Sequence, residues 1–211
     1  MLSGEGGTPQ APHEESVTLS QPQLKHAFVA FGSNLSFGDD PPERLILRAI
    51  VALAPIAQGT VKASRLYRTP CFPVGAGPDF VNAAAVVTLR QGVTAPDMLA
   101  LLHSIEASFG RRRQQRWGMR TLDIDLLALD DSVLPDAVTQ DRWRLLSPDR
   151  QAQDVPDQLI LPHPRMQDRA FVLVPLSEVA ADWHHPRLGQ SVAQMLARLP
   201  AADVAAVTSL E

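Results

Sequence analysis

Two aspartates spaced two residues apart, Asp123 and Asp125, are the strongest candidates for chemistry in this sequence. They lie in the apolar run 121–129, which we predict to be a strand. Residues two apart in a strand point to the same face, so the two carboxylates would lie side by side. Such a pair is stable beside a cation, and hard oxygen ligands favour Mg²⁺ or Ca²⁺. Taken alone, however, an Asp-x-Asp pair is more often a solvated strand face.

An arginine-rich segment directly precedes this strand. Residues 111–120 read Arg-Arg-Arg-Gln-Gln-Arg-Trp-Gly-Met-Arg, which places five arginines within ten residues. Arginine presents a fixed fork of donors that matches phosphate oxygens. A cationic loop beside a metal-binding pair suits phosphoryl or pyrophosphoryl transfer. The loop with Trp117 would equally suit a non-catalytic RNA-binding module, but the carboxylates would repel a phosphate backbone and favour the enzyme.

A second polar segment carries His163 between two prolines, followed by Arg165 and Arg169. The prolines hold the histidine in an extended loop, and the arginines add cations suited to phosphate. A simple surface histidine remains the alternative for His163. The sequence contains no Gly-x-x-x-x-Gly-Lys-Ser/Thr motif, so a nucleotide would bind without a P-loop.

The elements that must position these residues follow from apolar periodicity and from capping residues. We predict, in chain order, a strand, a helix begun by Pro41 and Pro42 and ended by Pro55, two strands, a helix and a strand: 27–31, 41–54, 61–67, 80–89, 95–109 and 121–129. Thr94 and Asp97 form a predicted capping pair for the second helix. This order is typical of an α+β, ferredoxin-like βαββαβ core with a mostly antiparallel sheet. We also predict a last strand at 170–174 and C-terminal helical segments near 176–179 and 191–199.

The composition of the 211 residues predicts one domain, at 25–211, after a disordered tail at 1–24. The polar stretch 130–158 looks like an irregular insertion. A net charge of -4 gives no reason to expect a nucleic-acid partner, and the single cysteine, Cys71, excludes a disulfide framework within the chain. The sequence shows neither a secretory signal nor an apolar run of about 20 residues, so we expect a soluble, cytoplasmic protein without a membrane partner.

Several motifs, taken together in chain order, resemble one family, the 6-hydroxymethyl-7,8-dihydropterin pyrophosphokinases of folate biosynthesis. The segments that carry the resemblance are Phe31–Leu35, Ser64–Pro70, Asp79–Ala84, Ile105–Glu106, Arg116–Asp125, Pro162–Met166 and Arg169–Phe171. It covers residues 27–199 apart from the insertion. His103 and Pro164 depart from the residues that many members carry at these positions.

The resemblance implies an ATP-dependent pterin pyrophosphokinase. Such an enzyme transfers pyrophosphate from ATP to the hydroxymethyl group of 6-hydroxymethyl-7,8-dihydropterin and releases AMP. The implied catalytic residues are Arg111, Arg120, Asp123 and Asp125, with two Mg²⁺ ions on the aspartates. The implied ATP-binding residues are His103, Glu106, Arg113, His163 and Arg169. The pterin ring would lie between Phe80 and Phe171, beside Thr69, Pro70, Phe72, Asn82 and Trp117. We expect a monomer, and a transferase for another heterocycle remains an alternative.

Overall fold

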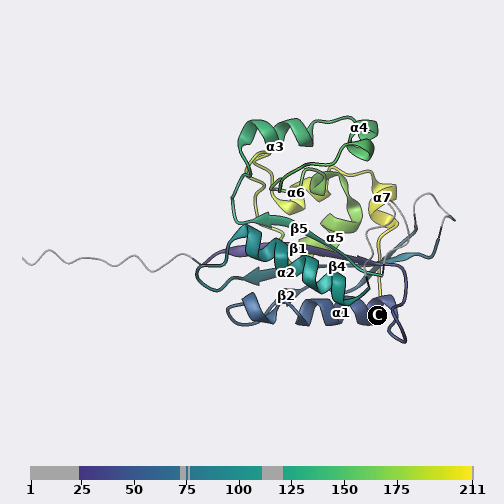
Figure 1. Cartoon of the computed structure of the whole chain (residues 1–211). Coiled ribbons are helices and arrows are strands. Elements are labelled where there is room, and N and C mark those ends of the chain that lie inside the picture. Colours follow the sequence, from purple (N-terminus) through teal and green to yellow (C-terminus); the bar gives the residue numbers. More distant parts are fainter. Residues whose placement is uncertain (1–23, 72–74, 76, 111–120, 211) are drawn as a thin grey trace, which may run out of the picture.

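The computed structural model describes residues 24–71, 75, 77–110 and 121–210, and an antiparallel sheet lies at its centre (Figure 1). Its strands are β1 (His26–Ser33), β2 (Lys62–Ala63), β3 (Tyr67–Thr69), β4 (Phe80–Thr88), β5 (Asp123–Leu129) and β6 (Thr208–Ser209). The spatial order is β5-β1-β4-β3-β6, and β2 also pairs with β4. β1 and β4 are almost continuously apolar because both of their faces are covered.

Two helices cover one face of the sheet, α1 (Pro42–Val51) and α2 (Ala95–Ser108). A 3-10 turn, η1 (Ala54–Ile56), follows α1, so the first helix ends earlier than the predicted stop at Pro55. The predicted capping pair of α2 is confirmed, since the Asp97 carboxylate accepts the Thr94 N–H at 2.9 Å and Thr94 Oγ1 accepts the Asp97 N–H at 3.4 Å.

The ferredoxin-like prediction is confirmed by this order of strands and helices. The segment predicted as one strand at 61–67 forms two short strands instead, β2 and β3, both paired with β4. Strand β4 is nearly as predicted from its run of valines and alanines, because Val81, Ala83 and Ala85 pack toward α1 and α2 while Ala84 faces the other side.

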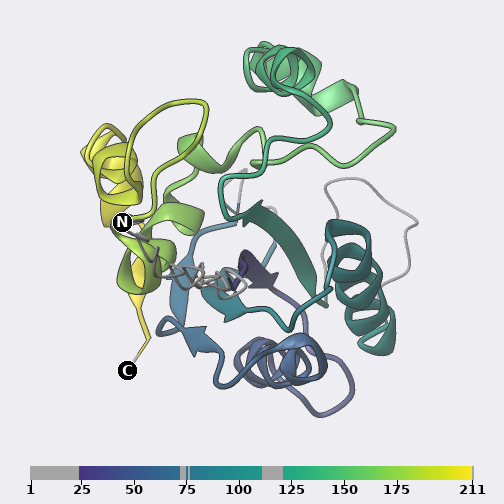
Figure 2. The same cartoon turned by 90° about the vertical axis from the view of Figure 1, so that its left-hand side faces the viewer.

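The predicted last strand at 170–174 is wrong, because these residues begin a helix, α5 (Ala170–Ala180), on the opposite face of the sheet (Figure 2). A short apolar run does not distinguish a strand from a buried helix. The longer run settles the question, since Val172, Leu176 and Val179 recur at helical spacing and are all buried. The helices α6 (Val192–Leu196) and α7 (Ala201–Ala205) follow α5.

The stretch 130–158, which we predicted to be irregular, contains two helices, α3 (Ala137–Arg144) and α4 (Pro148–Gln153). Asp136 caps α3, since its Oδ1 accepts the Thr139 N–H at 2.9 Å. Figure 1 shows α3 and α4 as an outer layer beyond α5 and α6. A further 3-10 turn, η2 (Met166–Asp168), lies between this insertion and α5. Among the described residues, no helix combines the length and the apolar character needed to cross a bilayer.

Candidate active site

A row of directly opposed residues crosses the sheet near one end: Tyr67 on β3, Asn82 on β4, Gly32 on β1 and Asp123 on β5. Opposed residues of antiparallel strands share a face of the sheet. This face is the one covered by α5, because Ala30, Ala84 and Leu127, which alternate in phase with the row, belong to the α5 core cluster. The register therefore brings Asn82 and the predicted metal pair onto one face, with a glycine between them.

Gly32 keeps the middle of this row open. A Cβ at this position would lie 3.4 Å from Asn82 Oδ1 and 4.0 Å from a ring carbon of Phe80. The Asn82 amide is itself oriented, because its Nδ2 donates to Thr69 Oγ1 at 2.8 Å. Both side chains are buried. The row therefore presents an ordered amide oxygen and a phenyl ring beside a surface with no side chain.

The two predicted metal ligands lie on β5 with their carboxylates partly exposed, as a site open to a substrate requires. Arg169 Nη1 lies 3.7 Å from Asp125 Oδ2, and the Arg169 guanidinium lies 5.6 Å from the centre of the Phe171 ring. Arg169 is the residue directly before α5, and Phe171 lies in the first turn of that helix. The second polar segment of the sequence therefore reaches the aspartate pair.

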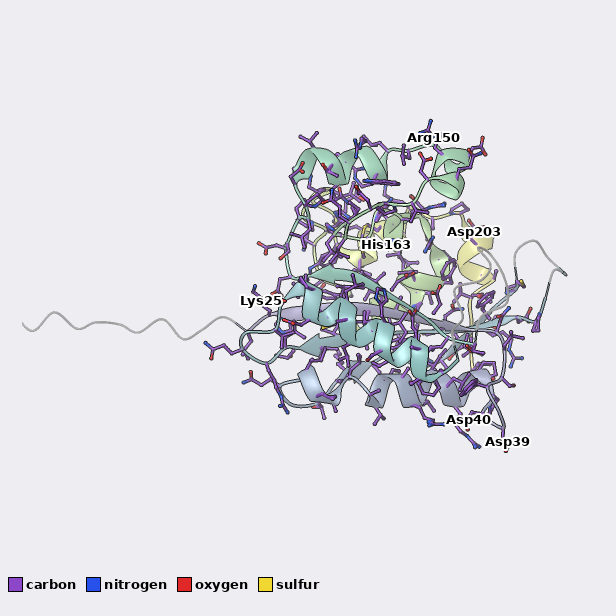
Figure 3. All side chains as sticks on the ribbon, in the orientation of Figure 1. Lys25, Asp39, Asp40, Arg150, His163 and Asp203 are labelled. Atoms are coloured by element: carbon purple, nitrogen blue, oxygen red, sulfur yellow. The ribbon has the colours of Figure 1, made fainter. Side chains whose placement is uncertain are left out.

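His163 lies on the same side of the sheet as the aspartate pair, between the sheet and the α3–α4 layer (Figure 3). The backbone N–H of His163 donates to the carbonyl of Leu127 on β5 at 2.7 Å. Nδ1 accepts the Arg165 N–H at 3.2 Å, which assigns the hydrogen of the neutral ring to Nε2. Burial, and then the Arg169 and Arg165 cations, lower the pKa of His163 to about 3. The ring is therefore a neutral donor near neutral pH.

Glu106 lies deeper than the resemblance implies. Its side chain, on α2, is only 2% exposed, and Oε1 accepts the Ile124 N–H at 2.8 Å. Ile124 lies between the two aspartates on β5, an edge strand of the sheet. Glu106 thus holds the backbone that carries the carboxylate pair. A type of residue and its spacing could not reveal this role, because it depends on how α2 packs against β5.

Two further residues support the row although sequence reasoning gave them no role. Ser33 Oγ donates to the carbonyl of Thr121 at 2.5 Å, and Asn34 Nδ2 donates to the carbonyl of Pro78 at 3.3 Å. These contacts anchor the segments that lead into β5 and β4. The available signal was the pair of polar residues directly after an apolar strand, both of which are buried.

The remaining predicted residues divide into two groups. Pro70 is exposed next to Thr69, and His103 is exposed one turn before Glu106 on α2. The others lie outside the described residues: Phe72, Arg111, Arg113, Trp117 and Arg120.

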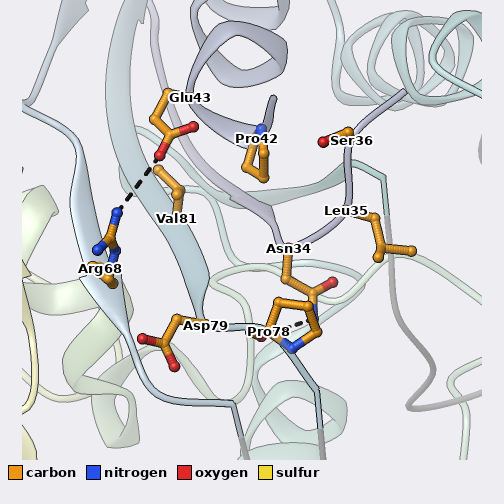
Figure 4. Close-up of a pocket in the computed structure, with 9 residues that line it drawn as sticks. All are labelled: Asn34, Leu35, Ser36, Pro42, Glu43, Arg68, Pro78, Asp79 and Val81. Carbon is orange, nitrogen blue, oxygen red and sulfur yellow. Dashed lines mark hydrogen bonds and ion pairs between the residues drawn. The ribbon is translucent and has the colours of Figure 1, made fainter. Parts of the chain in front are cut away.

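A pocket of about 450 Å³ lies at the start of α1, and Figure 4 shows its lining. Arg68 and Val81 belong to it, and Arg68 Nη2 lies 3.8 Å from Glu43 Oε1. Both residues alternate with the row, so they point to the opposite face of the sheet. None of the predicted site residues lines this pocket. The candidate site is therefore the open surface on the α5 side.

Comparison with known proteins yields one family. The model of 7,8-dihydro-6-hydroxymethylpterin-pyrophosphokinase matches residues 28–181. A Synechocystis sp. protein is 36% identical over 185 residues, covering 87% of this chain and 81% of its own. A Methylorubrum extorquens protein is 32% identical over 182 residues, covering 86% of this chain and 98% of its own. Both are named 2-amino-4-hydroxy-6-hydroxymethyldihydropteridine pyrophosphokinase.

Solved structures agree on the fold. A Plasmodium falciparum HPPK-DHPS A437G structure with pteroate aligns with a TM-score of 0.56 at 16% identity. The alignment covers 87% of this chain but only 45% of the Plasmodium chain, so this chain spans less than half of that protein's length. The match over residues 28–181 and the two relatives show that the chain belongs to the 7,8-dihydro-6-hydroxymethylpterin-pyrophosphokinase family.

Proposed function

We propose that this chain transfers the pyrophosphate of ATP to the hydroxymethyl group of 6-hydroxymethyl-7,8-dihydropterin, giving the pterin diphosphate and AMP in folate biosynthesis. The observation that carries the proposal is the row Asn82–Gly32–Asp123, which sets a polar amide on the same sheet face as a carboxylate pair, with the Phe80 ring close to Gly32. One half of the row suits a flat heterocycle, and the other suits a polyphosphate with its metal.

On the phosphate side, Asp123 and Asp125 are oxygen donors on neighbouring positions of one strand face, which fits two Mg²⁺ ions. When bound, Mg²⁺ would neutralise charge on the triphosphate. Arg169, beside Asp125, would bind phosphate oxygens, and the neutral His163 would donate from Nε2. We further propose that Arg111, Arg113 and Arg120 supply more cations from the adjacent segment, as the sequence predicts.

On the acceptor side, the ring would stack between Phe80 and Phe171, because offset aromatic contacts favour a flat heterocycle. Asn82 Oδ1 would accept from the edge of the ring, because the hydrogen bond that Nδ2 donates to Thr69 fixes the orientation of the amide. Gly32 would let the ring approach the backbone of β1 closely. These residues hold the hydroxymethyl oxygen toward the aspartate pair, which favours direct attack on the phosphate chain.

The test is a product assay with ATP, the hydroxymethyl-dihydropterin and Mg²⁺. We expect AMP and a pterin diphosphate, identified by mass spectrometry, and no activity after chelation of the metal. Asp123→Asn and Asp125→Asn should each lower kcat by about 100-fold or more, the usual cost of losing transition-state charge stabilisation. Asp131→Asn, an exposed aspartate just beyond β5, is the matched control and should retain activity.

Release of ADP in place of AMP, or full activity in Asp123→Asn, would overturn the proposal. A panel of related heterocyclic alcohols separates the pterin from other acceptors. We also propose that the enzyme acts as a monomer, which analytical ultracentrifugation can test. A cytoplasmic location stays a prediction from the sequence.

A further inference from the structure

The helix α3 of the 130–158 insertion departs from the usual burial pattern of amphipathic helices. Its buried side chain is polar: Gln140 is 0% exposed. Two apolar side chains of this segment face outward, since Val138 is 80% exposed and the C-cap residue Leu145 is 72% exposed, while Ala137 and Trp143 are only half-buried. A surface helix ordinarily buries its apolar residues and exposes its polar ones. The reversed arrangement indicates that Gln140 is buried for a specific contact.

That contact is with the segment leading to His163. Gln140 Nε2 donates to the carbonyl of Pro162 at 3.1 Å. The residues on either side are tied as well, because Leu161 exchanges both backbone hydrogen bonds with Leu134, at 2.9 and 3.1 Å, and the His163 N–H donates to Leu127. Three consecutive residues are thus fixed, one of them by a side chain of the insertion.

The contact does not arise from favourable packing alone. Gln140 Oε1 is buried and has no hydrogen-bond partner among the residues that the structure describes. An unpaired buried oxygen destabilises a fold, so an apolar residue of similar length would suit the interior better. The hydrogen bond that Gln140 Nε2 donates to the carbonyl of Pro162 therefore explains why an amide is present at this buried position.

A second tether holds α3 from the other side. Asp141, next to Gln140, accepts from Arg187 Nη2 at 2.5 Å and from Arg144 Nη2 at 2.9 Å. These cations lower the pKa of Asp141 to about 2, so it remains charged at any pH at which the protein is assayed. Arg187 lies in the loop between α5 and α6. α3 thus connects the loop that follows α5 with the segment that precedes α5.

We propose that Gln140 is a positioning residue for the nucleotide half of the site. By holding the carbonyl of Pro162, it fixes the chain that leads through His163 to Arg169, beside the aspartate pair. The insertion is then a brace for phosphate binding. This inference rests on the proposed function, because His163 and Arg169 are assigned to ATP there.

The variant Gln140→Met tests this inference, because it keeps the length of the side chain and removes both the donor and the unpaired oxygen. Calorimetry with a non-hydrolysable ATP analogue and Mg²⁺ measures binding without turnover. We expect the Kd of the analogue and the KM of ATP to rise about fivefold, the usual effect of one lost hydrogen bond. The KM of the pterin at saturating ATP should stay within about twofold. Tm should change little, because the carbonyl of Pro162 loses its donor while the unpaired oxygen of Gln140 is removed.

Val138→Met, on the exposed side of the same helix, is the matched control and should bind the analogue like the unmodified protein. Unchanged affinity in Gln140→Met would overturn the inference, as would a similar loss in Val138→Met. Where Gln140→Met does not fold, Gln140→Asn gives the same comparison, because its amide stops one methylene short of Pro162. A protein that binds the analogue but releases no AMP contradicts the proposed function, while the binding comparison still decides the role of Gln140.

Discussion

The buried carboxylate of Glu106 helps to set the position of two partly exposed carboxylates, those of Asp123 and Asp125. Its Oε1 accepts the N–H of Ile124, the residue between Asp123 and Asp125. Since β5 is an edge strand, β1 supports it from one side only, and α2 must satisfy the groups on the other. The orientation of the carboxylate pair therefore depends on a side chain that comes from the opposite face of the sheet.

This arrangement predicts different outcomes for two substitutions of Glu106. Glu106→Gln keeps an oxygen that can accept the Ile124 N–H, whereas Glu106→Leu leaves that donor unpaired, at a cost of about 1–3 kcal/mol of unfolding free energy. We expect faster amide hydrogen exchange at Ile124 in the leucine variant and a higher Mg²⁺ concentration for half-maximal activity. Slow exchange at Ile124 in Glu106→Leu, equal to that in Glu106→Gln, would contradict this role.

Residue types and spacing identified Asp123 and Asp125 because strand periodicity alone assigns them to one face, whereas Asn82 was named only from the family resemblance. The same reasoning did not reach Glu106 or Ser33, since their partners, Ile124 and Thr121, are 18 and 88 residues away. Contacts of this kind depend on tertiary packing, which a single sequence does not display.

At the scale of elements, the end of α2 is fixed by a glycine and two aromatic rings. Gly110 adopts φ = 75°, a left-handed conformation typical of helix ends. A Cβ there would overlap the ring of Phe37, with Cδ2 only 2.9 Å away. Phe37 in turn meets Phe109 edge-on, with ring centres 6.5 Å apart. No side chain other than hydrogen fits between the helix end and this ring.

Gly110→Ala should therefore be more harmful than a glycine substitution that meets only backbone strain. The left-handed conformation costs alanine about 1–2 kcal/mol, and the overlap with Phe37 adds to this. Gly92→Ala is the matched control, because Gly92 has φ = 87° and nothing within 4 Å of the added Cβ. Chemical denaturation measures both variants. The double variant Gly110→Ala/Phe37→Ala lacks the overlapping ring, so its loss of unfolding free energy should be smaller than the sum of the two single losses. A loss equal to that sum would contradict the overlap.

The elements that were predicted well carry explicit boundary residues. α2 begins at the Thr94–Asp97 pair and ends before Gly110, so both of its boundaries could be predicted from the sequence. α5 carries no capping side chain, and Pro175 interrupts its apolar sequence. Its first residues therefore resembled a strand, and only packing against the sheet determines that they form a helix.

At the scale of the whole molecule, a buried histidine lies in the loop that Arg187 ties to the insertion through Asp141. His185 is 0% exposed, and its Nδ1 accepts the N–H groups of Arg187 and Leu188. Burial, followed by the Arg144 cation and with a smaller part from Arg187, lowers the pKa of His185 to about 4; Asp141 opposes the shift. The folded protein therefore keeps this ring neutral where the unfolded chain would protonate it.

The sign of the resulting pH dependence follows from proton counting. Between pH 6.5 and about 4, the unfolded chain binds a proton at His185 that the folded protein does not. The free energy of unfolding should therefore fall as the pH is lowered through this window, by up to about 3 kcal/mol, and be fully present above it. His185→Asn, whose oxygen can replace Nδ1 as acceptor, should flatten the profile. Equal slopes for both proteins in denaturation from pH 4 to 7 would contradict this prediction.

The sheet also works as a ruler. Asn82 and Asp123 are separated by two strand spacings across Gly32, about 9.5 Å, and main-chain hydrogen bonds define that length. Core side chains can be exchanged without changing it. A chain that shares only 36% or 32% of its residues with its relatives can therefore keep the same spacing between the two halves of the proposed site.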